Sequence, residues 1–125
     1  MVVLDSSAVL AYLWSEPGSD RVGDVLRDGK ISSVNVAEVL SKLIDNGLGG
    51  DAADLTFAGL NLSAIAFDTD QARLAGKLRS MTRSFGLSLG DRACLALAIQ
   101  HEGQVITADR IWAKLDLGID IEIIR

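Results

Sequence analysis

The sequence predicts an α/β fold, with one mostly parallel central sheet and helices packed on both of its faces. Two observations predict it. Short apolar runs that are typical of buried strands alternate along the chain with longer stretches of helical character. Parallel strands need long crossover connections, and the helical stretches between successive strands supply them. The length of 125 residues fits one domain, so we expect a single domain over residues 1–125.

The predicted strands are short runs of mainly apolar residues bounded by turn-forming or capping residues. In chain order they cover residues 2–5, 30–32, 63–67, 104–107 and 119–124. Each of the first four leads directly into a helical stretch. We therefore expect the carboxyl ends of these strands to meet at one edge of the sheet.

The predicted helices have apolar residues at helical spacing, lie between a capping residue and a breaker, and give the order βααβααβααβαβ. They cover residues 8–14, 20–27, 33–44, 51–60, 69–85, 88–102 and 110–115. The expected caps are Ser6 or Ser7 for the first helix, Ser33 for the third, Asp68 or Thr69 for the fifth, Ser88 for the sixth and Asp109 for the last. The fifth is expected to be one long amphipathic helix that ends at Gly86.

Composition excludes several classes of protein. Apolar residues make up 49% of the chain, which excludes intrinsic disorder. The longest apolar runs, 8–14 and 93–99, have seven residues, whereas a membrane span needs about 18. We expect no signal peptide, because Asp5 interrupts the first apolar stretch and the first basic residue is Arg21. The single cysteine, Cys94, allows no internal disulfide and is consistent with the cytoplasm.

The charge balance bears on nucleic-acid binding. The formal net charge is −5, from 17 acidic and 12 basic residues, and this total by itself argues against a nucleic-acid partner. The segment 71–90 is locally different, because it has a charge of +4 and no acid. The single histidine, His101, excludes multi-histidine zinc sites and mechanisms that need two imidazoles.

Four acidic residues follow strands or begin helices at the edge where ligands bind in such sheets. Asp5 follows the first strand, Glu38 lies in the second turn of the third helix, Asp91 lies in the first turn of the sixth, and Asp109 follows the fourth strand. Clustered carboxylates repel one another unless a cation is bound. Oxygen donors without histidine or cysteine suit Mg²⁺ or Mn²⁺. The sequence therefore predicts a divalent-metal site.

Each acid taken alone also has an ordinary structural interpretation. Asp5 and Asp109 could cap helices, Asp91 could form a capping box with Ser88, and Glu38 could pair with Lys42 one turn along its helix. The metal-site interpretation is favoured because all four acids are predicted at the same edge.

Four segments carry a family resemblance. They are Leu4-Asp5-Ser6-Ser7-Ala8-Val9-Leu10-Ala11, Ser33-Val34-Asn35-Val36-Ala37-Glu38-Val39-Leu40, residues 87–98 with Ser88-Leu89-Gly90-Asp91, and Ile106-Thr107-Ala108-Asp109. They resemble the four acidic motifs of PIN domains, in the same order and at the usual separations. The chain is also similar in size to the ribonuclease toxins of VapBC-type toxin–antitoxin pairs, which consist of a PIN domain alone.

This resemblance implies a Mg²⁺-dependent endoribonuclease with an RNA substrate, an antitoxin protein as partner, a homodimeric state and no membrane association. It implies that Asp5, Glu38, Asp91 and Asp109 hold one or two metal ions, with Glu38 as a ligand or a base that positions water. Some family members have a further acid after the fourth motif, for which Asp116 is the nearest candidate.

Other residues are candidates for supporting roles. Ser6 and Thr107 could hydrogen-bond the carboxylates, or serve only as a cap and a strand-end hydroxyl. Candidate contacts to RNA phosphates are Arg79, Arg83, Arg92 and Arg110, whereas Arg73 and Lys77 are more typical of a solvated helix face. Tyr12 and Trp14 lie in a run of three large residues that cannot all face the sheet, so either could contact a partner.

Two alternatives to a ribonuclease stay open. A receiver-type signalling domain also has an acidic Mg²⁺ pocket at its strand ends. A sequence that resembles this family would have two adjacent acids after the first strand and a lysine after a late strand. Here a single Asp5 and the sequence Thr107-Ala108-Asp109 stand at those places. The other alternative is a non-catalytic PIN fold that only binds RNA or protein, and the presence of all four acids disfavours it.

Overall fold

Five short strands form one parallel sheet in the computed structural model, which describes residues 1–125. The strands are β1 (Val2–Leu4), β2 (Gly29–Ser32), β3 (Ser63–Ile65), β4 (Gln104–Thr107) and β5 (Ile121–Ile123), in the spatial order β3-β2-β1-β4-β5. All four strand pairs are parallel, as the sequence predicts. The chain builds outward from β1 through β2 to β3, and then places β4 and β5 on the other side of β1. The centre of the sheet is therefore the point where the direction of winding reverses.

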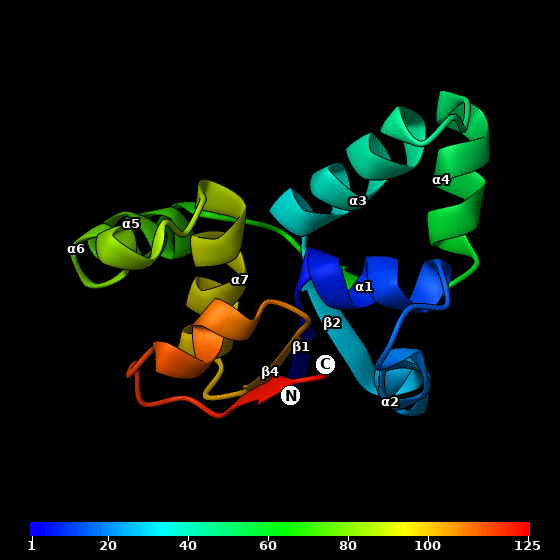
Figure 1. Cartoon of the computed structure of the whole chain (residues 1–125). Helices are drawn as coiled ribbons and strands as arrows, with labels where there is room; N and C mark the ends of the chain where they lie inside the picture. Colours follow the sequence, from blue (N-terminus) through cyan, green and yellow to red (C-terminus); the bar gives the residue numbers. More distant parts are fainter.

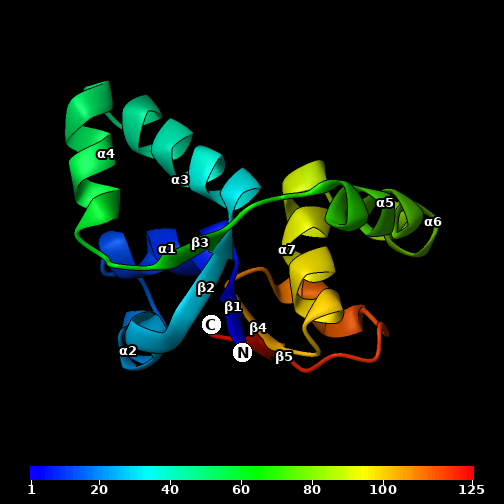
Figure 2. The same cartoon turned by 180° about the vertical axis from the view of Figure 1, so that it is seen from behind.

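Helices cover both faces of the sheet (Figures 1 and 2). They are α1 (Ser6–Leu13), α2 (Ser19–Val25), α3 (Ser33–Asp45), α4 (Gly50–Ala58), α5 (Thr69–Lys77), α6 (Arg79–Thr82) and α7 (Leu89–Gln100), with the short 3-10 segments η1 (Leu26–Asp28), η2 (Arg83–Phe85) and η3 (Arg110–Lys114). One face carries α7, with α5 and α6 packed outside it, and the other carries α1 and α2, with the α3–α4 hairpin projecting beyond the sheet. No helix is both long and apolar enough for a membrane crossing.

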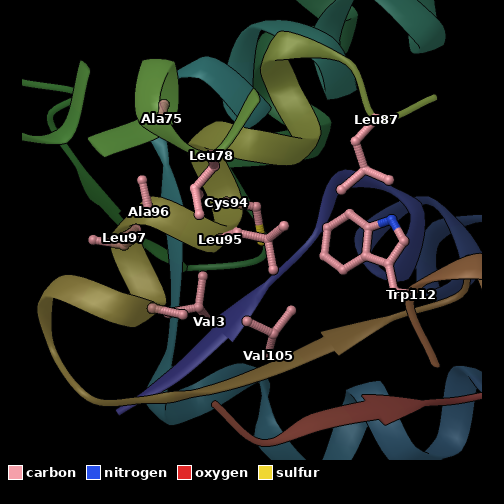
Figure 3. Close-up of a cluster of buried hydrophobic side chains, with 11 residues drawn as sticks. Val3, Ala75, Leu78, Leu87, Cys94, Leu95, Ala96, Leu97, Val105 and Trp112 are labelled. Carbon is pink, nitrogen blue, oxygen red and sulfur yellow. The ribbon is translucent and has the colours of Figure 1, made fainter. Parts of the chain in front are cut away.

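Alternation along the central strands produces two separate hydrophobic cores. Val3 and Val105 pack with α7 and Trp112 on one face (Figure 3), whereas their neighbours Leu4 and Ile106 pack with α1 and α3 on the other. All four of these strand residues are fully buried. Successive side chains of a strand point to opposite faces, so the short apolar runs of β1 and β4 supply both cores.

The long helix predicted over residues 69–85 is wrong in one respect, because the chain breaks it into α5, α6 and η2. The apolar residues whose helical spacing led to the prediction are only partly buried: Ala75 and Leu78 are buried, whereas Ala72 and Met81 are exposed. The buried face includes the polar residues Gln71 and Thr82 and continues at helical spacing through the break. At Leu78, however, ψ is −15°, which tightens the backbone toward 3-10 geometry. The chain ends η2 at Gly86, which has a φ of +70°.

Three expected local features are also corrected. Neither Ser6 nor Ser7 caps the first helix, because α1 begins at Ser6 and the N-cap position is occupied by Asp5. Ser32, not Ser33, caps α3, and the Ser33 hydroxyl instead accepts a hydrogen bond from the backbone N–H of Phe67. The segment after Asp109 is the 3-10 helix η3, although Asp109 caps it as predicted.

Candidate acidic site

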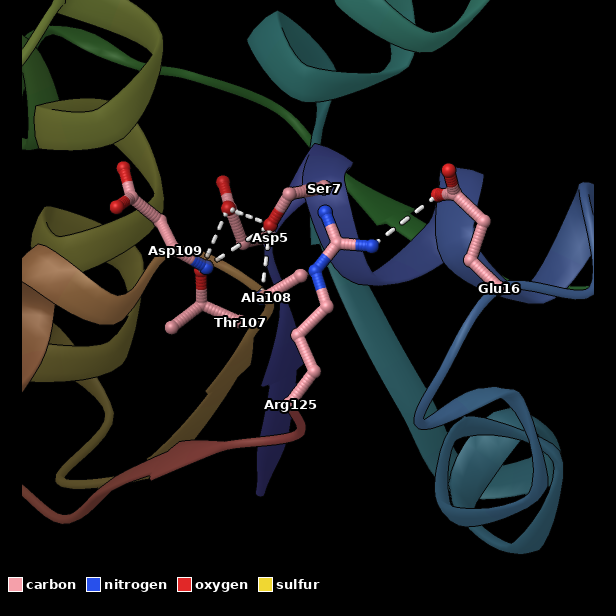
Figure 4. Close-up of polar contacts among 7 residues, drawn as sticks. All are labelled: Asp5, Ser7, Glu16, Thr107, Ala108, Asp109 and Arg125. Atoms are coloured by element: carbon pink, nitrogen blue, oxygen red, sulfur yellow. Dashed lines mark hydrogen bonds and ion pairs between the residues drawn. The ribbon is translucent and has the colours of Figure 1, made fainter.

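Asp5 lies at the carboxyl end of the central strand and is 2% exposed. Its backbone N–H donates to the Ile106 carbonyl at 3.0 Å, which ties it to β4. The hydroxyls of Thr107 and Ser7 donate to Oδ2 at 2.8 and 2.5 Å (Figure 4). The other carboxylate oxygen, Oδ1, is buried and has no hydrogen-bond partner. One half of this carboxylate is therefore held by the protein, and the other half is available to a ligand.

Two loops that are a hundred residues apart in sequence are joined beside Asp5. The Ser7 hydroxyl, which donates to Asp5, accepts from the Ala108 backbone N–H at 2.9 Å. The Thr107 hydroxyl, which also donates to Asp5, accepts from the Asp109 backbone N–H at 3.1 Å. Asp109 Oδ1 accepts from the N–H of Ile111, so its side chain is held at the start of η3 while staying exposed. These bonds fix Asp109 next to Asp5.

Glu38 reaches the same edge from α3. Its Oε1 accepts from the Ser6 hydroxyl at 3.0 Å and from Asn35 Nδ2 at 2.7 Å. Asn35 also donates to the backbone carbonyl of Gly90 at 3.0 Å, which connects α3 with the first turn of α7. A Cβ atom at Gly90 would collide with the Glu38 carboxylate, so only glycine permits this close approach. No ion pair joins Glu38 to Lys42, because these contacts hold the carboxylate instead.

Asp91 begins α7 and has a capping role as well as a place in the acidic group. Its Oδ2 accepts from the Ser88 N–H at 2.8 Å, and its own N–H donates to the Ser88 hydroxyl at 3.1 Å. This is the capping box that the sequence predicts. Only Oδ2 is used in it. The capping interpretation and the ligand interpretation are therefore compatible for this residue.

The causes of two pKa shifts connect Asp91 with each of the other three carboxylates, and connect Asp5 with Glu38. Burial raises the pKa of Asp5 to about 6; the hydrogen bonds from Ser7 and Thr107 oppose this rise, and the charges of Asp91 and Glu38 add to it. Burial also raises the pKa of Asp91; its Ser88 hydrogen bonds lower the pKa, and Glu38 and Asp109 raise it further. No basic residue is among the causes for either group. The protein itself therefore does not neutralise this pocket.

The donor set fits a hard divalent cation. All four groups are carboxylates, and the unpartnered Oδ1 of Asp5 is a buried anionic oxygen of the kind that Mg²⁺ prefers. No three of the acidic, histidine or cysteine side chains are arranged as a ready-made metal cluster in this structure. Cys94, which is also buried behind these acids, has a pKa well above its usual value because burial and the nearby negative charges favour the thiol. It is therefore not a thiolate ligand.

The basic candidates lie outside this pocket. Arg92 Nη1 donates to the Ala75 carbonyl at 3.0 Å, which directs its side chain toward α5. Arg110 is exposed and donates through Nε to the carbonyl of Arg125. Arg79 and Arg83 are exposed on α6 and η2, as Arg73 and Lys77 are on α5. These four residues form an exposed basic stripe that the structure does not bring to the carboxylates.

The remaining predicted residues are placed as follows. Tyr12 is half-buried with its ring beside Gly23 of α2, and Trp14 at the end of α1 is 40% exposed. Asp116 is exposed in the loop after η3 and is not among the groups that shift the pKa of Asp5 or Asp91.

Sequence reasoning missed several residues that build the site. Asn35 has a local signal, because it lies three residues before Glu38 and therefore on the same helix face. The sequence predicts only a capping role for Ser7, whereas its hydroxyl donates to Asp5 and accepts from the Ala108 N–H after β4. Outside the site, the pairing of the Arg125 guanidinium with Glu16 at 3.4 Å also has no local signal (Figure 4). Long-range pairing of this kind is set by the fold.

Comparison with known families identifies the chain. The PIN-domain family matches residues 2–117, and the protein belongs to this family. The assignment agrees with the resemblance of the four acidic segments and replaces the receiver-type alternative. The comparison with curated proteins gave no match.

Solved structures show the same fold over nearly the whole chain. A chain of VapBC2 from Rickettsia felis, solved bound to a DNA fragment from their promoter, matches with a TM-score of 0.75 and 17% identity over 98% of each chain. DNA-bound VapBC from Salmonella typhimurium matches with a TM-score of 0.76 and 19% identity, over 99% of this chain and 98% of that one. VapBC-5 from Mycobacterium tuberculosis, a member of the VapBC family of toxin–antitoxin systems, matches with a TM-score of 0.59 and 25% identity. The match covers 98% of this chain and 96% of that one. The expected resemblance to VapBC proteins is confirmed.

Proposed function

We propose that this PIN-domain protein is a Mg²⁺-dependent endoribonuclease and the toxin of a toxin–antitoxin pair. The observation that carries the proposal is the set of four carboxylates around Asp5, whose buried oxygen has no partner within the protein. We propose that residues 1–125 act as one PIN domain in the cytoplasm.

The residues have distinct proposed roles. Asp5 and Asp91 are the central ligands of a Mg²⁺ or Mn²⁺ ion, and Asp109 completes the set. A divalent ion bound there would activate a water for attack on a phosphodiester and neutralise charge on the phosphate. Ser7 and Thr107 orient Asp5 through their hydrogen bonds. Glu38 keeps Oε2 free of hydrogen bonds, because Ser6 and Asn35 bind Oε1, so Oε2 is the atom that orients water or accepts its proton.

The proposed partners follow from the solved relatives, which include a toxin–antitoxin complex from Klebsiella pneumoniae and a member of the VapBC family of toxin–antitoxin systems. We propose an antitoxin protein and a second copy of this chain, with the exposed ring of Trp14 and the edge of Tyr12 as contact candidates. Co-expression with the neighbouring reading frame tests the first: a small protein should co-purify with this chain. Analytical ultracentrifugation of the chain alone tests the second and should give the mass of a dimer.

A cleavage assay tests the activity. Purified protein is incubated with structured RNA and Mg²⁺, in parallel with the variants Asp5→Asn and Asp91→Asn, and with Asp54→Asn as a matched control on the exposed face of α4. We expect cleavage by the wild type and the control and none by the two site variants. Cleavage that persists in EDTA, or in both site variants, contradicts the mechanism. RNA binding without any cleavage identifies a non-catalytic module instead.

A further inference from the structure

A groove between α1 and α3 opens from the acidic site and has a volume of about 460 Å³. Ser6 and Glu38 belong to both the groove and the acidic site. The groove continues away from the site along Leu10 of α1 and Ala37, Ser41 and Lys42 of α3. Whatever occupies it is therefore adjacent to a group held at the carboxylates.

The hydroxyls that line the groove can accept hydrogen bonds but have no proton left to donate. The Ser6 hydroxyl donates to Glu38 at 3.0 Å, and the Ser41 hydroxyl donates to the Ala37 carbonyl at 2.8 Å. The third lining hydroxyl, that of Ser7, donates to Asp5 and accepts from the Ala108 N–H. Each hydroxyl has one proton and two lone pairs, so Ser6 and Ser41 present only lone pairs to the groove, and Ser7 also has no proton to offer. A matching occupant carries hydrogen-bond donors, as a ribose 2′-hydroxyl or a base amino group does.

The charge and the apolar wall of the groove narrow the choice further. Lys42 is exposed and forms no ion pair, so its ammonium is free to bind an anion. It lies four residues after Glu38, on the same face of α3 and one turn farther from the acidic site. Leu10 and Ala37 supply an apolar wall between the two. The groove thus offers an apolar surface, the acceptor hydroxyls of Ser6 and Ser41, the carboxylate of Glu38 at its inner end and a cation at its far end.

We propose that the groove holds the RNA nucleotide next to the scissile phosphate, with its base against Leu10 and Ala37 and its outer phosphate on Lys42. The proposal rests on the proposed ribonuclease function. It favours RNA over a protein segment because a nucleotide in the groove is covalently continuous with a phosphate at the carboxylates. A single nucleotide carries all three features that the groove selects: a flat apolar base, donor groups and an anion.

Direct binding separates this proposal from the cleavage activity. The protein used is the full chain carrying Asp91→Asn, which we expect to bind RNA without cutting it. The probe is a fluorescein-labelled single-stranded oligoribonucleotide in Mg²⁺ buffer. Lys42→Gln and Ala37→Leu are added separately in this background. The matched controls are Lys30→Gln on β2 and Ala52→Leu on the exposed face of α4. Both groove positions are exposed, and melting curves confirm that each variant folds.

We expect Lys42→Gln to weaken binding severalfold and to lower the salt dependence by about 0.7 in the slope of log affinity against log salt, with Lys42→Arg restoring both. Ala37→Leu should weaken binding about tenfold, since it fills the space of a base, and should leave the slope unchanged. The controls should bind as the Asp91→Asn protein does.

The possible results separate the two proposals. Losses confined to the groove variants support nucleotide binding in the groove, and cleavage by the wild type then places that nucleotide next to a scissile phosphate. Unchanged RNA binding by both groove variants overturns it, and cleavage by the wild type then still supports the ribonuclease. Unchanged RNA binding together with loss of a co-purifying small protein assigns the groove to a protein segment and overturns the proposal. Absence of any RNA binding contradicts both.

Discussion

The surroundings of Asp5 disfavour its charged form, and this makes the stability of the folded protein depend on pH. It is 2% exposed, one of its oxygens has no partner, and its pKa of about 6 lies above the ordinary value of 3.8. Because the folded pKa is raised, the folded state binds this proton more tightly than the unfolded state does. Stability from this group is therefore greatest at low pH and is lost as the pH rises from about 4 through 6.

The first prediction is that Asp5→Asn stabilises the metal-free protein at pH 8. The gap between 3.8 and about 6 corresponds to a destabilisation of about 3 kcal/mol in the wild type at that pH. The asparagine leaves an unpartnered amide at the Oδ1 position, which costs about 1 kcal/mol, so we expect a net gain of about 2 kcal/mol. Urea unfolding in EDTA measures it. The gain should shrink as the pH is lowered from 6 toward 4, and a gain that is constant with pH contradicts the assigned cause.

The individual residues show what local sequence can reveal about a site. Asp5, Asp91 and Asp109 could be selected from sequence because each immediately follows a strand or begins a helix. Their structural roles were also readable: the capping box of Asp91 and the N-cap of Asp109 are both present. The bonds of Asn35 to Gly90 and of Ser7 to Ala108 join residues that are far apart in sequence. Nothing local predicts them, since they depend on how the helices pack.

At the scale of elements, the contact between α3 and α7 determines where Glu38 lies. Gly90 allows the first turn of α7 to approach the Glu38 carboxylate, and Asn35 fixes the two helices at this point. The sequence predicts both helices and places Glu38 in the acidic site, with an ion pair to Lys42 as the alternative. The helical spacing that predicted one helix over 69–85 was real, yet it could not reveal the change in backbone geometry at Leu78.

The second prediction uses this contact. Gly90→Ala places a Cβ against the end of a flexible side chain, so the Glu38 carboxylate should move while the fold persists. We expect RNA cleavage to fall by at least about tenfold, which is the usual loss when a residue that holds a metal ligand in place is changed. The melting temperature should change little.

Gly76→Ala on α5 is the matched control, because a Cβ there meets nothing within 4 Å. It should keep full activity and stabilise the protein by about 0.5–1 kcal/mol. Equal activity in the two alanine variants would show that the position of Glu38 does not matter for cleavage.

At the scale of the whole molecule, the net charge of −5 conceals a separation of charge. Four acids meet at one edge of the sheet, while Arg73, Lys77, Arg79 and Arg83 form the basic stripe on α5, α6 and η2. Composition alone argued against a nucleic-acid partner. The three-dimensional arrangement removes that objection, since a bound divalent cation would offset much of the charge of the acidic edge.

The third prediction is that Mg²⁺ stabilises the protein by relieving repulsion among the four acids. At a Mg²⁺ concentration 100 times the dissociation constant, the gain is about 2.7 kcal/mol, or a rise in Tm of about 10 °C. Differential scanning calorimetry with and without Mg²⁺, at equal ionic strength, measures it. Asp5→Asn and Asp91→Asn should each reduce the shift, and an equal shift in the double variant would place Mg²⁺ elsewhere.

The fourth prediction concerns the basic stripe. Replacing both Arg79 and Arg83 with glutamine should weaken RNA binding about equally for all sequences, because contacts to phosphates carry no base information. The salt slope should fall by about 1.4 if both arginines contact single-stranded RNA. Arg27→Gln, at an exposed arginine of η1 outside the stripe, is the control. A slope that is unchanged in the double variant would leave the stripe as a solvated surface.

The bonds from Ser7 to Ala108 and from Thr107 to Asp5 have a consequence during protein synthesis. A nascent chain that has emerged only as far as α7 contains three of the four acids, but neither Thr107 nor Asp109 is available to orient or complete the site. Asp5 then has no strand beside it on the β4 side and stays open to water. On the proposed function, we expect the protein to be inert while it is still being translated and to gain activity only after β4 has added to the sheet. The messenger and ribosome that produce it would then be protected from it until the chain is nearly finished.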